Sequence, residues 1–167
     1  KMDSIIGAAM TLVDSSADLV VMSDHGFGSF RRKFNLNSWL MDHGYASALR
    51  ASTRGNAAYF ADVDWPDTTA YGLGLNSLYL NIKGREPEGA VNPANKKEVA
   101  NKLKTHLESI TDPATGRKVI SRVCLPEQTY SGPYVDQAPD LVICYNHGYR
   151  ASWETVIGKY PKTHIDD

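Results

Sequence analysis

LVVMSDHGFGSF, residues Leu19–Phe30, is the stretch on which the interpretation of the whole chain depends. It opens with four apolar residues, Leu19–Met22, and the absence of polar alternation predicts a strand covered on both faces, as in a parallel sheet. Asp24, His25 and Gly26 follow. If the Asp24 carboxylate and the His25 imidazole are buried, each needs a partner. A carboxylate oxygen and an imidazole nitrogen together suit Zn²⁺ or a similar divalent ion. Gly26 would allow a ligand to approach the backbone closely. The alternative is a turn aspartate beside a hydrogen-bonded histidine.

The residues around this stretch predict an α/β arrangement. Apolar residues at helical spacing predict an amphipathic helix over residues 2–17, and a second, short helix is expected around Trp39–Met41, ended by Gly44. Helix, buried strand, loop and helix is the order typical of an α/β fold. Ligand sites of such folds lie at the carboxyl ends of strands, which is the position of Asp24 and His25.

The middle of the chain is richer in glycine, asparagine, proline and aromatic residues. A helix is predicted over residues 93–110, directly after Asn92, because asparagine is a favoured helix N-cap. Short strands are predicted on both sides of this helix. The four predicted strands of this part of the chain lie at residues 68–72, 77–82, 117–124 and 138–146.

The composition excludes several classes of protein. The 167 residues suffice for one domain with a hydrophobic core, and the formal net charge of −1 gives no basic surface for a nucleic-acid duplex or an anionic membrane. No apolar run approaches the ~18 residues that a membrane-spanning helix needs. Two cysteines are too few for a disulfide-rich scaffold. The sequence leaves the compartment and the oligomeric state open.

Three segments of the chain carry recognisable motifs. The first is Ser-Asp-His-Gly within LVVMSDHGFGSF, the second is SLYLNIKGREPEGAV at residues 77–91, and the third is QAPDLVICYNHGYRASW at residues 137–153. Together they resemble the type I phosphodiesterase/nucleotide pyrophosphatase family of the alkaline-phosphatase-like superfamily. The three segments occur in the family order and span most of the chain.

The resemblance implies an α/β/α sandwich with a mostly parallel central sheet and a smaller α+β insert. The core sheet and helices are expected from residues 1–45 and 136–167, and the insert from about 46–135, within a single catalytic domain. The chain begins inside a helical pattern and ends on KYPKTHIDD, without an element that docks. We therefore expect the catalytic domain to be incomplete in these 167 residues.

The resemblance also implies which residues bind metal. In the family, the Asp and His of this motif bind one of two divalent ions, usually zinc, so Asp24 and His25 are the expected ligands. The family's Thr or Ser nucleophile and its further Asp and His ligands belong to upstream segments without a counterpart here, so no catalytic nucleophile is assigned. His164 is a poor match for the last histidine ligand, because it lacks the glycine context.

Several other residues are candidates for weaker roles. Arg85 could contact phosphate, since a guanidinium matches phosphate geometry, although a structural ion pair is the favoured interpretation. His147 and Arg150 follow the last predicted strand and are candidates for the rim of the substrate site. His43, in a second Asp-His-Gly triplet, is expected to cap a helix, and His106 is expected on a solvent-facing helix surface.

The expected function is metal-dependent hydrolysis of phosphodiester or pyrophosphate bonds in a small-molecule or nucleotide substrate. This chain would carry half of the metal site and be inactive by itself. A sulfatase, phosphonatase or phosphomutase of the same superfamily is an alternative, because only the nucleophile segment separates these activities. A non-catalytic α/β binding module, in which Asp24 and His25 only form hydrogen bonds, is the alternative from another class.

Overall fold

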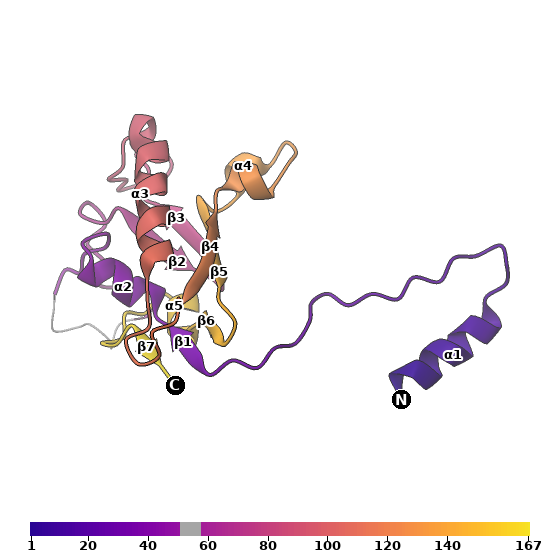
Figure 1. The fold of residues 1–167 in the computed structure, drawn as a ribbon. Coiled ribbons are helices and arrows are strands. Elements are labelled where there is room, and N and C mark those ends of the chain that lie inside the picture. Colours follow the sequence, from indigo (N-terminus) through magenta and orange to yellow (C-terminus); the bar gives the residue numbers. More distant parts are fainter. Residues whose placement is uncertain (51–57) are drawn as a thin grey trace.

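A computed structural model describes residues 1–50 and 58–167 as a folded body with a long N-terminal arm (Figure 1). The helices are α1 (Met2–Leu12), α2 (Leu36–Asp42), α3 (Lys96–Ser109), α4 (Pro126–Thr129) and α5 (Trp153–Val156), with 3₁₀ turns η2 (Pro93–Asn95) and η3 (Val135–Gln137). The strands are β1 (Arg32–Phe34), β2 (Ala70–Leu73), β3 (Ser77–Leu80), β4 (Ile120–Cys124), β5 (Leu141–Tyr145), β6 (Tyr149–Ala151) and β7 (Ile165–Asp166). Among the described residues, no helix is both long and apolar enough to cross a membrane.

The larger sheet has four strands in the order β2-β3-β5-β4, and every neighbouring pair is antiparallel. β2 and β3 form a hairpin whose turn contains Gly74 with a φ of 75°, a conformation that glycine adopts without steric cost. β5 lies between β3 and β4, with Leu141 and Ile143 fully buried. The helix α3 covers the sheet through Leu103 and Leu107, which are also fully buried.

The smaller sheet has the order β6-β1-β7 and begins where the arm ends. β1 runs parallel to β6 and antiparallel to β7. The helix α2 follows β1 and is held against β2 by Asn37, whose side chain bonds both backbone groups of Gly72 at 2.7 and 3.0 Å. A Cβ at Gly72 would lie 2.7 Å from Leu36, so glycine permits this close approach.

The prediction of a mixed α/β chain is confirmed, whereas the prediction of a mostly parallel central sheet is wrong. In the part of the chain that the structure describes, β1 and β6 are the one parallel pair of named strands. For β2 and β3 the reason lies in the connection, because a tight turn joins them and a tight turn can join only antiparallel strands. The division into a core and an insert stays a prediction.

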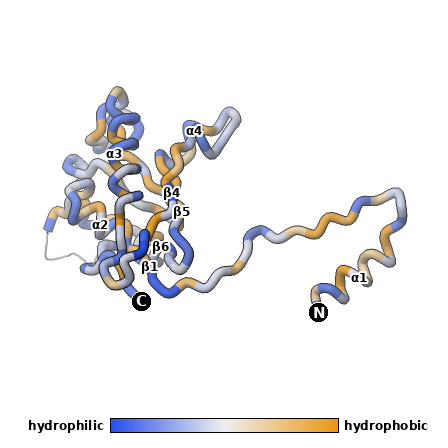
Figure 2. The backbone as a smooth tube through the Cα atoms, viewed as in Figure 1, coloured by the Kyte–Doolittle hydropathy of each residue, from blue (hydrophilic) through white to orange (hydrophobic). Residues whose placement is uncertain are grey.

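The arm, residues 1–30, is where the structure differs most from expectation. The predicted buried strand at Leu19–Met22 is wrong: Val20 is 76% exposed and Met22 is 83% exposed. The first helix ends at Leu12 rather than near residue 17, and none of its residues is buried. Figure 2 shows apolar residues recurring along the arm, well away from the body. A strand needs backbone partners as well as apolar side chains, and no strand of the described residues pairs with this segment.

The other predicted elements agree with the structure within a few residues. The Asn92 side chain accepts a hydrogen bond from the Ala94 N–H at 3.0 Å and caps the 3₁₀ turn that leads into α3. α2 ends at Asp42, and His43 is its C-cap, followed by Gly44 with a φ of 73°. These elements depend on local signals, namely caps, turns and periodicity, which the sequence displays directly.

Candidate functional site

Asp24 and His25 lie side by side on the arm and are exposed to solvent. The Asp24 Oδ1 atom accepts a hydrogen bond from the His25 backbone N–H at 3.0 Å, and Asp24 Oδ2 lies 3.4 Å from His25 Nε2. His25 Nδ1 lies 3.0 Å from the Gly26 carbonyl oxygen. Because a carbonyl oxygen can only accept, this contact assigns a proton to Nδ1.

This geometry suits two neighbouring ligands of one divalent cation. Zinc–nitrogen and zinc–oxygen distances of about 2.1 Å at a tetrahedral angle separate the two ligand atoms by about 3.4 Å. A ligand histidine usually donates its other ring N–H to a carbonyl or carboxylate, as His25 does to Gly26. Within residues 1–50 and 58–167, no group of three or more His, Cys, Asp or Glu side chains is placed to hold a metal ion. Asp24 and His25 therefore fit as two donors of a site that these residues do not complete.

Arg85 is held by protein acceptors on every side of its guanidinium. Nη2 lies 2.7 Å from Asp140 Oδ2, and Nε lies 2.8 Å from Glu86 Oε1. Burial alone would raise the pKa of Asp140, but hydrogen bonds from Arg85, Lys96 and the Leu80 N–H outweigh it and lower that pKa. These contacts fit the structural ion pair that the sequence favours, and a phosphate contact by Arg85 stays a prediction.

His147 and Arg150 lie on either side of the turn into β6. The His147 side chain is exposed, and its backbone N–H donates to Asn146 Oδ1 at 2.9 Å. The Arg150 guanidinium lies 4.0 Å from the ring centroid of Phe30 and 5.3 Å from that of Trp153, both cation–π contacts. Arg150 thus contacts the base of the arm, while its predicted place at a substrate rim stays a prediction, as does that of His147.

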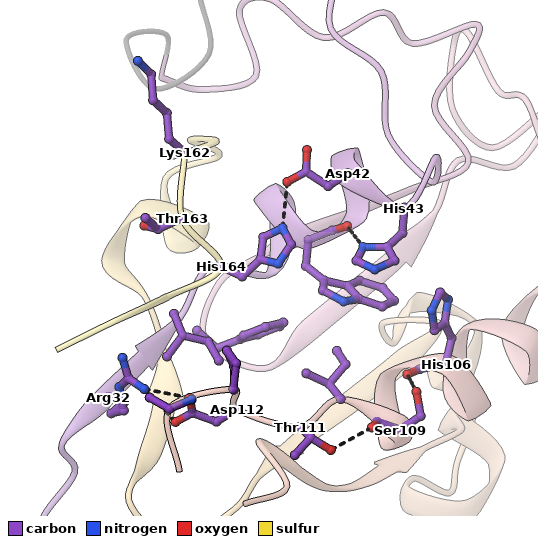
Figure 3. A pocket seen from close by; sticks show the side chains of 16 residues that line it. Arg32, Asp42, His43, His106, Ser109, Thr111, Asp112, Lys162, Thr163 and His164 are labelled. Atoms are coloured by element: carbon purple, nitrogen blue, oxygen red, sulfur yellow. Dashed lines mark hydrogen bonds and ion pairs between the residues drawn. The ribbon is translucent and has the colours of Figure 1, made fainter. Parts of the chain in front are cut away.

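A cavity of about 650 Å³ opens beside the end of α2 (Figure 3). Its wall is built by α2, the end of α3, the loop that follows α3, and the segment before β7. Three histidines from these separate elements line it: His43, His106 and His164, here called the histidine cluster. The ring centroids of His43 and His106 are 5.0 Å apart, and those of His43 and His164 are 5.8 Å apart.

The buried ring of Trp39 is the base of this cluster. His43 stacks on the indole with centroids 4.3 Å apart, and His106 meets the indole edge-on at 4.7 Å. His106 is half-buried rather than fully solvent-facing, because Trp39 and Tyr45 cover one side of it. Burial, together with the nearby His43 and Lys102, lowers the pKa of His106.

Each imidazole of the histidine cluster has one nitrogen engaged. His43 Nδ1 lies 2.8 Å from the Trp39 carbonyl oxygen, which assigns the proton to Nδ1. His106 Nδ1 lies 3.2 Å from the Tyr45 hydroxyl, and His164 Nε2 lies 2.7 Å from Asp42 Oδ2. The second nitrogen of each ring has no hydrogen-bond partner in the part of the chain that the structure describes.

A buried carboxylate, Asp112, forms the opposite wall of the cavity. It accepts hydrogen bonds from Arg32 Nη1 at 2.7 Å and from the Tyr149 hydroxyl at 2.8 Å, with further bonds from Thr115 and the Ala114 N–H. Burial alone would raise the pKa of Asp112, but the hydrogen bonds outweigh burial and hold it at about 2. Asp112 is therefore charged and fully engaged at any pH near neutrality.

The sequence gives little warning of this cavity. The three histidines are far apart along the chain, and each alone is typical of a helix cap, a helix surface or a loop. The one available signal is the second Asp-His-Gly triplet at residues 42–44, which marks a helix end but not what packs against it. The convergence depends on tertiary packing around Trp39.

Comparison with known proteins gives one match. A family model described as type I phosphodiesterase / nucleotide pyrophosphatase matches residues 1–160. No curated protein and no solved structure matches the chain. The matched range includes the arm with Asp24 and His25 as well as most of the folded body.

Proposed function

Since the chain belongs to the type I phosphodiesterase / nucleotide pyrophosphatase family, we propose that it carries part of the active site of a metal-dependent hydrolase. The proposed substrates are small phosphodiesters or nucleotide pyrophosphates. The family is one of hydrolases, and its match over residues 1–160 supports a phosphodiester substrate over the sulfatase, phosphonatase and phosphomutase alternatives.

The pair Asp24 and His25 is the observation that carries this proposal. The 3.4 Å between Asp24 Oδ2 and His25 Nε2 suits one cation between them, and the Gly26 carbonyl holds the imidazole in the tautomer that a metal needs. A bound divalent ion, zinc by resemblance, would supply charge neutralisation for phosphoryl transfer. The residues of this chain would position that ion by presenting both donors from one short, glycine-bounded segment.

The remaining parts of the site are proposed to lie in sequence outside residues 1–167. The resemblance assigns the nucleophile, the second metal site and further ligands to segments without a counterpart here. A catalytic zinc usually has three protein ligands, and Asp24 and His25 supply two. We therefore propose that these 167 residues alone hydrolyse no phosphodiester, and that the domain is complete only in a longer chain.

Among the candidates for substrate contact, His147 fits best. Its imidazole is exposed, whereas the Arg85 guanidinium is held by Asp140 and the Arg150 guanidinium lies against the rings of Phe30 and Trp153. His147→Ala in the complete enzyme is expected to raise KM with little change in kcat, as expected for loss of uniform substrate binding.

The test uses the complete enzyme with Asp24→Ala and His25→Ala. Loss of an outer contact to a metal site typically costs roughly 10–100-fold, so loss of a direct ligand is expected to cost more than ~100-fold in activity. Hydrolysis of bis-p-nitrophenyl phosphate and bound metal are measured together. Asp18→Asn, which removes a carboxylate from the same arm, is the matched control. Near-wild-type rates and metal content in both alanine variants would refute the proposal.

A further inference from the structure

The histidine cluster brings together three imidazoles, which can become positively charged at mildly acidic pH, in a place with few carboxylates to balance that charge. The centroids of neighbouring rings lie 5.0 and 5.8 Å apart, so two charged imidazoles would repel each other; His43 is exposed, and His106 and His164 are half-buried. A charge on His164 would meet the Asp42 carboxylate 2.7 Å away. A charge on His43 or His106 would meet no carboxylate partner among residues 1–50 and 58–167.

The other charged and titratable groups around the cavity do not offset this repulsion. Asp112 is already engaged by Arg32 and Tyr149, and Arg32 also bonds Asp167 at 2.9 Å. The remaining groups that face or border the cluster are basic or neutral: Lys102 on α3, Lys162 at the rim, and the Tyr45 hydroxyl. The Lys162 side chain points away from the three rings in Figure 3.

The cluster also joins three elements that are distant in sequence. His43 ends α2, His106 lies in the last turn of α3, and His164 belongs to the segment that leads into β7. That segment is anchored to α2 by the Asn35 N–H, which donates to the His164 carbonyl oxygen at 2.7 Å. Repulsion within the cluster would therefore act on the contacts between α2, α3 and the C-terminal segment.

We propose that the histidine cluster is a proton switch: protonation of the cluster at mildly acidic pH loosens α3 and the C-terminal segment from α2 and widens the cavity. Neutral imidazoles pack around Trp39 and hold α2, α3 and the C-terminal segment together around the cavity. The proposal is independent of the metal site and of the hydrolase activity, because none of the three histidines belongs to the arm.

The direction of the pH dependence follows from the surroundings of His106. In an unfolded chain a histidine titrates near pH 6.5, whereas burial and the nearby His43 and Lys102 lower the pKa of His106 in the folded protein. The folded state then binds fewer protons than the unfolded state, so stability is present above about pH 6.5 and is lost as the pH falls below it. Asp112, with a pKa of about 2, stays charged throughout this range.

The first test is the urea unfolding equilibrium at pH 7.5 and 5.5. We expect the unfolding constant of the wild-type chain to rise about tenfold at the lower pH, because the folded state binds fewer protons than the unfolded state. His106→Gln keeps a hydrogen-bonding side chain without the charge and is expected to reduce that change to less than about threefold. His147→Gln, at an exposed histidine outside the cavity, is the matched control and is expected to keep the tenfold change.

The second test reads the cluster directly by proton NMR of the five imidazoles. His43→Gln is expected to raise the apparent pKa of His106, because it removes a positive neighbour. The Asn35 amide reports on the C-terminal segment and is expected to exchange at least tenfold faster at pH 5.5 than intrinsic rates predict. Independent titration of all five histidines near pH 6.5, with Asn35 equally protected at both pH values, would overturn the proposal even if the glutamine variants fail to fold.

Discussion

The chain contains the triplet Asp-His-Gly twice, and the two copies have opposite surroundings. At residues 24–26 it lies on the exposed arm, where its contacts are within the triplet and with the neighbouring Ser23 and Phe27. At residues 42–44 it ends α2, where the aspartate bonds His164 and the histidine stacks on Trp39. The same three residues therefore present open donors in one place and take part in the histidine cluster in the other. Neighbours, and not the triplet itself, decide which chemistry remains available.

The largest effect on stability is expected from Trp39, which packs against the histidine of the second triplet. Trp39 is 3% exposed and supports both His43 and His106. Trp39→Ala should lower the free energy of unfolding by about 3–5 kcal/mol, because it removes a large buried ring and leaves a cavity. Urea denaturation at pH 7.5 measures this. A loss below about 1 kcal/mol would show that the packed surroundings of the second triplet contribute little to stability.

The next largest effect on stability is expected at the cavity wall opposite the second triplet, where Tyr149 bonds Asp112. Tyr149→Phe removes a hydrogen bond to the buried Asp112 carboxylate and should cost about 1.5–3 kcal/mol. Because the folded pKa of Asp112 is about 2, below the value near 3.9 in an unfolded chain, this carboxylate stabilises the fold above pH 4 and loses that effect as the pH falls toward 2. The variant should therefore unfold at a higher pH during acid titration followed by circular dichroism.

The two glycines of the triplets offer a matched pair. Gly44 has a φ of 73°, and a side chain there would meet open space, so Gly44→Ala tests backbone strain alone. We expect a loss of about 1 kcal/mol for Gly44→Ala. Gly26→Ala, where φ is not positive and space is also open, should change stability by less than about 0.5 kcal/mol. Equal losses in thermal denaturation would contradict the contrast between the two surroundings.

The smallest effect on stability is expected at the first triplet. Asp24→Ala and His25→Ala should each change the free energy of unfolding by less than about 0.5 kcal/mol, since both side chains are exposed and contact no residue outside the arm. The same substitutions are expected to abolish most activity in the complete enzyme. A large loss of stability in the 167-residue chain would instead show that the arm packs on the body.

Local signals account for the parts of the fold that the sequence predicts well. The Asn92 cap, the Gly44 helix end and the periodicity of Leu103 and Leu107 each act over a few residues, so α2, α3 and the β2-β3 hairpin are expected correctly. The apolar run Leu19–Met22 also expresses a preference for burial. It cannot identify which backbone would pair with it, because strand pairing is non-local.

The same distinction between local and non-local signals applies to the candidate sites. Asp24 and His25 are adjacent in sequence, so their proximity was predictable, whereas their exposure on an arm was not. His43, His106 and His164 are distant in sequence, and only the packing around Trp39 brings them together. A motif search finds the first kind of site, and a structure is needed for the second.

The position of β1 has a consequence for how this chain folds. β1 is the first strand in sequence, yet Arg32 pairs with Tyr149 and Lys33 with Asp166, near the other end of the chain. Closing so long a loop costs conformational entropy before its contacts form, and such non-local pairing slows folding. During synthesis, β1 must wait for its partners until almost all 167 residues have left the ribosome. The smaller sheet is therefore expected to form late in folding.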